Sequence, residues 1–567
     1  MLTPPDLGLP AIFKEFRPGQ LDLASRIAGS KKRFFLLNAP TGTGKTLIMA
    51  TVQKLLDAHT TYLCSTKQLQ DQVCHDFPYA VDLRGRNNYV CLKRPTQFPT
   101  ISAAHCTKMP ERAHCTPEKR NHWCRYNCPR FNGDVFVSIV GVPPPSTFTT
   151  PCPCLRWCPY EIRKDEAVKA ELAVLNLPFF LHEANYVGRL SGKPLVVLDE
   201  ADTLEDTLRS FVELSISKAQ IEKLELEPPK RVSKPEEDKH IRDWVEWAFR
   251  TLAVVEVRLK ELAKDGENPS SQVLYQRDEL ERLTSRLKAF GSTVDTHWVF
   301  ISTESRWSFK PVFVARYADK YIWQHGSRFL CMSATLVNPR QWARDLGIDW
   351  EEVEYLEAPT TFPVEHRLIH YRPAVNLSRK SGDEDWSLLI NAIDVILDEH
   401  QAVRGLVHTV SYSLARHILQ HSRHAARMVW HDSAATRVDA FARYKAGKNL
   451  VLVSPSYGRG ISLDGDLGRF VIVAKVPYPD LGDKQIAARL YGAKDGKSWY
   501  ATKTVRELVQ ATGRAVRSVD DWASMYVLDG KFDNLYSEWQ WIFPAWWREA
   551  LRREDTHEGL RQECVPT

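Results

Sequence analysis

A glycine-rich turn holds the residues best suited to chemistry: residues 39–46 read Ala-Pro-Thr-Gly-Thr-Gly-Lys-Thr. Apolar runs over 34–37 and 47–50 predict a buried strand before the turn and a helix after it. In this arrangement the backbone N–H groups of the turn and the positive end of the helix face a bound anion. Lys45 would reach the β- and γ-phosphates of a nucleotide, and the Thr46 hydroxyl would ligate Mg²⁺. The residues predicted to bind the phosphates and Mg²⁺ are Thr41, Gly42, Thr43, Gly44, Lys45 and Thr46.

A second element supplies two adjacent carboxylates. The apolar run over 195–198 predicts a buried strand that ends in Asp199 and Glu200. Asp199 would hold the Mg²⁺ shell, and Glu200 would orient or deprotonate the attacking water. An acidic pair after a strand is often only a helix N-cap, and the turn has alanine where the strict phosphate-loop pattern begins with glycine. Together, however, the two elements predict hydrolysis of a nucleoside triphosphate.

Composition sets the broad class. The chain has 567 residues, of which 43% are apolar and 26% charged, and this length suits roughly three or four domains. A run of about 18 apolar residues, which a membrane span would need, does not occur. The first residues lack the charged and apolar blocks of a signal peptide, so we expect a cytoplasmic protein. The net charge of +6 permits a polyanionic partner without requiring one.

Cysteine usage is unusual. Eight of the twelve cysteines fall between residues 91 and 158. In a reducing cytoplasm such a cluster predicts metal ligation rather than disulfides. The eight are Cys91, Cys106, Cys115, Cys124, Cys128, Cys152, Cys154 and Cys158.

The strand and helix patterns predict an α/β fold with two P-loop-type lobes and two insertions. Strand patterns alternate with helices near the N-terminus and again from about residue 366, which predicts two parallel sheets. The predicted strands cover 34–38, 61–64, 195–198 and 329–332 in the first part and 405–409, 449–453, 470–474 and 525–528 in the second. Because only the first lobe carries a phosphate loop, we expect the nucleotide to bind between the lobes. The predicted division is 1–90, 159–210 and 301–365 for lobe 1, 91–158 for a metal-cluster insertion, 211–300 for a helical arch insertion, and 366–567 for lobe 2.

Two long helical patterns make up the predicted arch. They cover about 240–264 and 272–290, and the polar stretch 265–269 between them is a turn signal. The pair would form either a solvated hairpin or an arch that contacts the substrate, and the pattern favours neither alternative.

Lobe 2 carries further candidate groups. A helix predicted over 503–517 contains Gln510, Arg514 and Arg517, and the two arginines, three residues apart, would share one face. Their guanidinium groups would meet the charge that develops on the transferring phosphate, as an arginine finger supplied in cis. The segment 333–335, Ser-Ala-Thr, follows an apolar strand pattern, and its hydroxyls would link the carboxylates to lobe movement.

The order of these motifs resembles that of superfamily 2 helicases. The flanks of Cys91 (residues 85–91) and Cys158 (residues 158–160) are similar to those of the first and last cluster ligands in the iron–sulfur branch that contains XPD and DinG. The resemblance implies two RecA-like lobes, a 4Fe–4S cluster, an arch domain and ATP-driven 5′→3′ movement on single-stranded DNA. It covers nearly the whole chain and both insertions. The motifs that carry it are 17–20, 39–46, 199–202, 333–335, 458–464 and 510–517.

The resemblance adds Arg17, Gln20 and Asp464 to the expected nucleotide-binding residues. Two positions depart from the family pattern. Asp202 stands where the family usually has histidine, a residue that would couple hydrolysis to DNA contact, and Arg459 stands where the family usually has an acidic residue.

Four thiolates hold a 4Fe–4S cluster. By resemblance, Cys91 and Cys158 are the outer ligands, and the third ligand lies some thirty residues before the last. Cys124 or Cys128 fits the third position and Cys106 or Cys115 the second, with Cys152 and Cys154 as rivals; the predicted set is Cys91, Cys115, Cys124 and Cys158. Zinc is the alternative metal, since it also takes four thiolate or imidazole ligands.

The predicted function is ATP-dependent unwinding of single-stranded or forked DNA by a monomer that does not bind membranes. One alternative is a DNA-stimulated translocase that does not separate strands. Another is a metal-containing nucleic-acid-binding protein in which ATP acts only as a switch. Candidate DNA contacts are Lys67, Gln68, Gln72, Arg84, Arg86 and Tyr89, although each is individually more typical of a solvated surface. The tryptophans at 539–547 predict packing rather than base stacking.

Overall fold

The computed structural model describes residues 2–89, 159–229, 238–263, 270–378, 381–433, 435–455, 463 and 465–554. The predicted cluster ligands Cys91, Cys115, Cys124 and Cys158 lie outside these residues, as does Asp464. The chain divides into two compact units. Unit 1 comprises Met1–Lys14, Gln53–Leu330 and Asp345–Ile348, and unit 2 comprises Glu15–Val52, Cys331–Arg344 and Asp349–Thr567.

A seven-stranded sheet contains the strands expected in the N-terminal half, in the order β10-β1-β9-β5-β2-β4-β3. Strand β1 pairs in parallel with β10, as does β2 with both β4 and β5, and β3 with β4. Every residue of β1 and β2 is buried, as expected for parallel strands that are covered on both faces. The strands are β1 (Phe34–Asn38), β2 (Thr60–Cys64), β3 (Ala80–Leu83), β4 (Leu172–Asn176), β5 (Lys193–Asp199), β9 (Gly326–Ser333) and β10 (Val353–Glu357). The strands predicted over 34–38, 61–64, 195–198 and 329–332 are thereby confirmed as β1, β2, β5 and β9.

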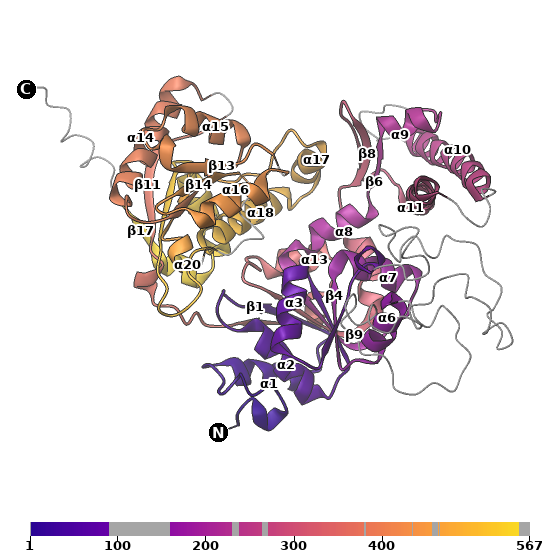
Figure 1. Cartoon of the computed structure of the whole chain (residues 1–567), viewed down its shortest axis with the longest axis horizontal. Helices are drawn as coiled ribbons and strands as arrows, with labels where there is room; N and C mark the ends of the chain where they lie inside the picture. Colours follow the sequence, from indigo (N-terminus) through magenta and orange to yellow (C-terminus); the bar gives the residue numbers. More distant parts are fainter. Residues whose placement is uncertain are drawn as a thin grey trace, which may run out of the picture. The chain divides into compact units, whose positions relative to one another are not determined.

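Helices alternate with these strands along the chain, as the sequence predicts (Figure 1). Thr66 caps the first turn of α3 by accepting a hydrogen bond from the Leu69 N–H group at 3.3 Å, which fixes where that helix begins. The helices are α1 (Gln20–Gly29), α2 (Lys45–Leu56), α3 (Lys67–Asp76), α6 (Pro159–Lys169), α7 (Leu177–Tyr186), α8 (Leu204–Val212), α12 (Ala315–Tyr321) and α13 (Pro339–Asp345).

The two long helices of the predicted arch are present as α10 (Asp238–Ala263) and α11 (Ser271–Thr293). They pack on a three-stranded antiparallel sheet, in the order β6-β8-β7, that the sequence analysis does not anticipate. The Phe309 ring lies at the centre of this packing, with ring centroids 5.1 Å from Trp244, 4.8 Å from Phe290 and 5.0 Å from Phe300. The remaining elements are β6 (Leu214–Ser217), α9 (Lys218–Lys223), β7 (Trp298–Ser302) and β8 (Arg306–Pro311).

A second seven-stranded sheet occupies the C-terminal part of the chain, in the order β13-β14-β12-β15-β16-β11-β17. All of its strand pairs are parallel. The strands are β11 (Ile369–Val375), β12 (Gly405–His408), β13 (Met428–Trp430), β14 (Val451–Ser454), β15 (Phe470–Val473), β16 (Ser524–Asp529) and β17 (Leu551–Arg553). The strands predicted over 405–409, 449–453, 470–474 and 525–528 are confirmed as β12, β14, β15 and β16.

Each face of the second sheet has its own buried cluster, because successive strand residues point to opposite faces. On one face Leu406 and Val473 pack with residues of α16, α18, α19 and α20. On the other face Val407 and Ile472 pack with residues of α14 and α15. The helices of this part are α14 (Asp383–Glu399), α15 (Tyr412–His421), α16 (Arg437–Ala446), α17 (Lys484–Gly492), α18 (Gly496–Thr512), α19 (Phe532–Trp539) and α20 (Ala545–Ala550).

The helix predicted over 503–517 differs from the observed one. Helix α18 begins at Gly496, where a side chain would collide with the backbone carbonyl of Leu490, and it ends at Thr512. Gly513 ends the helix, since its N–H group still donates to the Val509 carbonyl at 3.0 Å while glycine is a poor helix former. Arg514 and Arg517 therefore follow the helix, and the prediction that they share one helical face is wrong.

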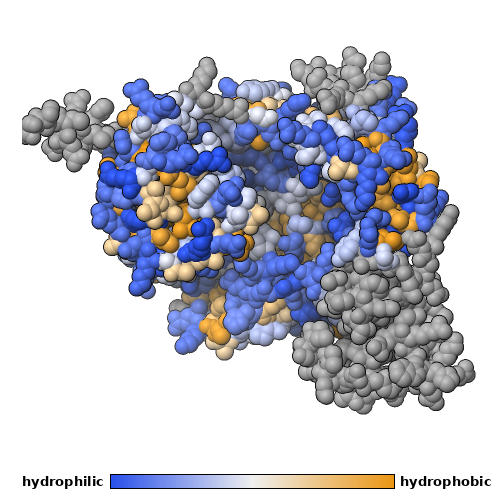
Figure 2. Space-filling view, turned by 45° about the horizontal axis from the view of Figure 1, so that its top comes forward, coloured by the Kyte–Doolittle hydropathy of each residue, from blue (hydrophilic) through white to orange (hydrophobic). Residues whose placement is uncertain are grey.

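The visible surface is mainly hydrophilic, with separate hydrophobic areas (Figure 2). Exposed apolar side chains include Val254 and Val257 of α10 and Tyr275 of α11. Within the described ranges, no helix combines the length and apolar character needed to span a bilayer.

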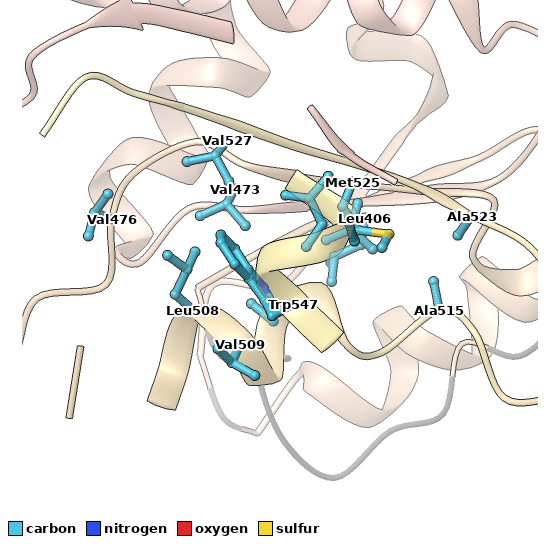
Figure 3. Packing of buried hydrophobic residues seen from close by; sticks show 14 of the residues in the cluster. Leu406, Val473, Val476, Leu508, Val509, Ala515, Ala523, Met525, Val527 and Trp547 are labelled. Carbon is cyan, nitrogen blue, oxygen red and sulfur yellow. The ribbon is translucent and has the colours of Figure 1, made fainter. Parts of the chain in front are cut away.

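Trp547 supports the prediction that the C-terminal tryptophans pack. Its side chain is completely buried, lies among Leu508, Val509 and Val473 (Figure 3), and donates from its indole N–H to the Thr512 hydroxyl at 2.8 Å. Trp541, by contrast, is 60% exposed. The same short segment thus contains a core residue and a surface residue of identical type.

Replacing Trp547 with alanine should therefore destabilise unit 2. Deleting a buried Trp side chain costs about 3–5 kcal/mol, which corresponds to a fall of roughly 10 °C in the unfolding midpoint. Thermal unfolding followed by circular dichroism measures the effect, with Trp541→Ala as the matched control that should leave the midpoint within about 1 °C. Equal midpoints for the two variants would contradict the packing role.

Candidate nucleotide-binding site

The glycine-rich turn has the predicted strand–turn–helix form. Strand β1 ends at Asn38 and α2 begins at Lys45. Gly42 and Gly44 have positive φ values of 83° and 74°, a conformation that glycine adopts without steric cost. A side chain at Gly42 would collide with the Phe362 ring, and one at Gly44 would collide with the Gln20 amide. Both glycines are therefore required by backbone conformation and by close contacts.

Arg17 and Gln20 bind the backbone of this turn. The Gln20 side-chain amide donates to the Thr43 carbonyl at 2.7 Å, and the Arg17 guanidinium donates to the Gly42 carbonyl. The Arg17 backbone N–H group in turn donates to the Gln20 side-chain oxygen at 2.8 Å. A backbone carbonyl oxygen that faced the site would repel a bound phosphate. Because Arg17 and Gln20 donate hydrogen bonds to the Gly42 and Thr43 carbonyl oxygens, the loop is better suited to bind an anion.

The lysine and threonine side chains of the turn also contact its backbone. The Lys45 ammonium donates to the Ala39 carbonyl at 3.3 Å, which keeps its charge beside the turn. The Thr43 hydroxyl donates to the Pro40 carbonyl at 2.8 Å. Thr46 is in the first turn of α2, next to Lys45. The predicted phosphate-binding residues thus lie together on one short loop, and Arg17 and Gln20 contact the backbone of that loop.

The two predicted carboxylates lie where β5 ends. Asp199 is the last residue of the strand, and Glu200 has a left-handed backbone with φ 52° and ψ 42°. The Tyr62 hydroxyl donates to Asp199 Oδ2 at 2.6 Å, and the Glu200 N–H group donates to Asp199 Oδ1 at 3.0 Å. The Ser65 hydroxyl donates to Glu200 Oε2. Both carboxylates therefore accept hydrogen bonds from donors on or directly after β2.

Burial keeps the neighbouring groups of β2 protonated. Burial, with the Asp199 charge as a second cause, raises the pKa of Tyr62 well above its ordinary value of 10. Burial likewise raises the pKa of Cys64 to about 12, again with a contribution from Asp199. Tyr62 is therefore a hydrogen-bond donor at neutral pH, and Cys64 is a neutral thiol rather than a reactive thiolate.

The Ser-Ala-Thr segment connects to the predicted lobe 2 motif within unit 2. Ser333 ends β9, and its carbonyl accepts a hydrogen bond from the Ala39 N–H group at 2.9 Å. Thr335 donates from its backbone N–H to the Ser333 hydroxyl at 3.0 Å. The Gln510 side-chain amide then donates to the Thr335 hydroxyl at 3.0 Å. Gln510 is thereby linked through two hydroxyl residues to the first residue of the phosphate loop.

The two arginines after α18 occupy different surroundings. Arg514 is among the charges that act on His408, a buried residue at the end of β12, where burial is the main cause that lowers the histidine pKa to about 4. The Arg517 backbone N–H group donates to Asp521, which also pairs with Arg469 at 2.9 Å. Their predicted role as an arginine finger stays a prediction.

Tyr62 and Ser65 are the site residues that the sequence analysis missed. Tyr62 lies within the strand pattern predicted over 61–64, and Ser65 directly follows it. What the sequence lacks is strand order: only the pairing of β2 with β5 brings these hydroxyls beside Asp199 and Glu200. For Ser65 the usable signal was a hydroxyl-bearing residue directly after the carboxyl end of a strand in a predicted parallel sheet.

Comparison with protein families gives two matches. The family described as Helicase C-terminal domain matches residues 396–550, and the family described as Type III restriction enzyme, res subunit, matches residues 13–98. The two matched segments contain Gln510 and Lys45, respectively.

Similar proteins agree with these matches. The regulator of telomere elongation helicase 1 homolog of Caenorhabditis elegans is 31% identical over 110 residues, covering 17% of this chain and 11% of that protein. The ATP-dependent DNA helicase DinG of Salmonella typhimurium is 27% identical over 231 residues, covering 34% of this chain and 32% of that protein. The match to a solved structure of XPD helicase covers 95% of this chain and 100% of the XPD chain, with a TM-score of 0.62 and 17% sequence identity.

The chain is thus similar to helicases of the XPD/DinG type in two family segments, in its curated relatives and in fold. The likeness to the XPD structure shows its fold, two RecA-like α/β lobes. The sequence matches cover between 8 and 32% of the curated relatives' own length. Asp202, which stands where the XPD/DinG pattern usually has histidine, is a buried residue that follows the two predicted carboxylates.

The hydrogen bond from Gln20 to the Thr43 carbonyl predicts a specific kinetic defect when Gln20 is replaced. Replacing Gln20 with alanine leaves the Thr43 carbonyl without its donor, and losing a buried hydrogen bond of about 1.4 kcal/mol should raise KM for ATP roughly tenfold. The bond supports the loop before and during the reaction, so kcat should change less than KM. Steady-state ATP hydrolysis measures both. Gln53→Ala is the control: Gln53 is equally buried on α2 but donates to the Glu171 carbonyl, away from the loop. An unchanged KM in the Gln20 variant would show that this hydrogen bond does not contribute to nucleotide binding.

Proposed function

We propose that the chain is an ATP-dependent DNA helicase, which moves 5′→3′ on single-stranded DNA and uses ATP hydrolysis to separate strands. The observation that carries the proposal is the hydrogen bond from Gln510 to Thr335. It joins the predicted lobe 2 motif to the segment that follows β9 and contacts the phosphate loop. A motor needs such a link, because a change at the nucleotide must alter the second lobe to produce movement.

The proposed chemistry assigns one task to each group. The turn around Lys45 binds the phosphates, Asp199 holds the metal shell, and Glu200 orients the attacking water. The Thr46 hydroxyl and the Asp199 carboxylate are hard oxygen donors, which suits Mg²⁺. When bound, Mg²⁺ neutralises charge on the β- and γ-phosphate oxygens. Arg514 and Arg517 are the proposed cations that meet the charge developing in the transition state.

DNA is the proposed substrate because relatives such as DinG are named DNA helicases. The predicted DNA contacts are not equally suited to that role. Arg84 pairs with Asp82 at 2.9 Å, and Arg86 pairs with Glu161 at 3.5 Å. These acidic partners already pair with both guanidinium groups, whereas the Lys67 ammonium donates to a neutral group, the Asn88 side-chain oxygen, at 2.5 Å. Lys67 and Gln68 at the start of α3 are therefore the better candidates for contacting a phosphate backbone.

A 4Fe–4S cluster held by Cys91, Cys115, Cys124 and Cys158 is part of the proposal. Support comes from the residues on either side of the insertion. The Tyr89 and Tyr160 rings contact each other edge to face at 5.6 Å, and the Arg86 guanidinium lies 4.8 Å from the Tyr160 ring centroid. The chain therefore leaves lobe 1 and returns to it at one place, as a cluster with the first and last cysteines among its ligands requires.

Lys45→Ala should abolish ATP hydrolysis and leave DNA binding intact, because the variant loses the cation that binds the β- and γ-phosphates. A coupled ATPase assay and fluorescence anisotropy with labelled single-stranded DNA measure the two properties. Lys54→Ala is the matched control: Lys54 is on the same helix but pairs with Glu171 at 2.7 Å. Hydrolysis that persists in Lys45→Ala would contradict the assignment.

The wild-type protein in the same assays separates the proposal from its alternatives. We expect DNA-stimulated hydrolysis and displacement of a strand from a forked duplex with a 5′ tail. Stimulation without displacement would favour a translocase. Hydrolysis that single strands do not stimulate would favour an ATP switch.

Metal analysis tests the cluster. Protein purified without oxygen should be brown and contain about four iron atoms per chain. Cys91→Ser should lose both the visible absorption and the iron, whereas Cys74→Ser is the matched control, since Cys74 is a free thiol of α3. Colourless protein that contains zinc would favour the alternative metal.

A further inference from the structure

The Asp199 carboxylate is held on both oxygens by protein donors. Oδ2 accepts from the Tyr62 hydroxyl at 2.6 Å, and Oδ1 accepts from the Glu200 N–H group at 3.0 Å. The first distance is typical of a hydrogen bond from a hydroxyl to a charged carboxylate. Each carboxylate oxygen can accept two hydrogen bonds or bind a metal shell with its remaining electron pair. The two donors thus fix the plane of the carboxylate and leave one electron pair on each oxygen.

Tyr62 is well suited to act as a rigid donor. Its side chain is 1% exposed, and it lies in the middle of β2. Strands β4 and β5 flank β2, with Val174 and Val197 in register with Tyr62. A tyrosine ring enclosed in this way has little freedom to rotate, and its buried hydroxyl needs a hydrogen-bond partner. Asp199, at the end of the neighbouring strand, supplies that partner.

We propose that Tyr62 is a positioning residue that orients Asp199 for Mg²⁺ in the nucleotide site. The inference rests on the proposed ATP hydrolysis and adds a residue that acts through Asp199 without touching the nucleotide. A carboxylate that is already oriented loses less freedom when the metal binds, so the hydroxyl raises metal affinity more than it changes the chemical step. Ser65 makes the corresponding contact to Glu200, so the end of β2 organises both acidic groups.

The proposal predicts a metal-specific defect in Tyr62→Phe. Removal of an outer-sphere partner of a metal ligand lowers metal affinity roughly tenfold or more. The Mg²⁺ concentration that half-saturates ATP hydrolysis should rise about tenfold, and kcat at saturating Mg²⁺ should stay near the wild-type value. Binding of a fluorescent ADP analogue without divalent metal should be unchanged. Mn²⁺ binding to the ADP complex, measured by electron paramagnetic resonance, should weaken by a similar factor.

Tyr79→Phe is the matched control. It also removes a partly buried tyrosine hydroxyl, but one that donates to Gln53 at 3.2 Å rather than to a carboxylate of the site. Its Mg²⁺ requirement should match that of the wild type. If Tyr62→Phe is less stable, the Mn²⁺ titration is expressed per bound ADP, so that only folded protein is counted.

An Mg²⁺ and Mn²⁺ requirement equal to that of the wild type in Tyr62→Phe would overturn the positioning role. A fall in kcat with unchanged metal affinity would overturn it as well. The proposed function fails differently, through absence of hydrolysis in the wild type or its persistence in Lys45→Ala. The Mn²⁺ titration compares Tyr62→Phe with the wild type whatever the result of those assays.

Discussion

Burial of parallel strands on both faces is the constraint on which the candidate site depends. Strands β1 and β5 are apolar over most of their length and carry polar groups at or just after their carboxyl ends, and β2 adds the Tyr62 hydroxyl from its middle. Because parallel strands run in one direction, these ends meet at one edge of the sheet. The phosphate loop follows β1, Ser65 follows β2, and Asp199 ends β5. Local sequence thus sets which residue ends each strand, and the pairing of β2 with β5 brings Tyr62 and Ser65 beside Asp199 and Glu200.

A left-handed residue lets two consecutive carboxylates share this edge. Along a regular strand, adjacent side chains point to opposite faces, which would separate Asp199 from Glu200. The left-handed backbone at Glu200 breaks the alternation. Such a conformation costs a non-glycine residue about 1–2 kcal/mol. The Ser65 hydroxyl, together with the Thr203 N–H and hydroxyl groups that donate to the Glu200 carbonyl at 3.0 and 2.9 Å, offsets this cost.

The sequence is sufficient for features that depend on neighbours in the chain, and it fails for those that depend on strand order. Apolar runs predict β1, β2 and β5, and the spacing of glycines predicts the loop at Gly42 and Gly44. The predicted end of α18 is wrong for a local reason, because Gly513 ends a helix that the apolar pattern would continue to residue 517. Tyr62 could not be assigned, because its partner Asp199 lies 137 positions away. The sheet beneath α10 and α11 was missed for the same reason, since β6 pairs with β8 across both helices.

The base of the insertion shows how lobe 1 tolerates a long segment between β3 and β4. Directly after the insertion, α6 contributes Lys164, which pairs with Glu183 of α7 at 2.5 Å, and both side chains are at most 3% exposed. The Tyr160 hydroxyl also donates to Glu183 at 3.2 Å. Removing one partner of a buried ion pair costs about 3–5 kcal/mol, so either single substitution at Lys164 or Glu183 should loosen α6 from α7. These anchoring contacts involve no residue of the cysteine-rich stretch 91–158.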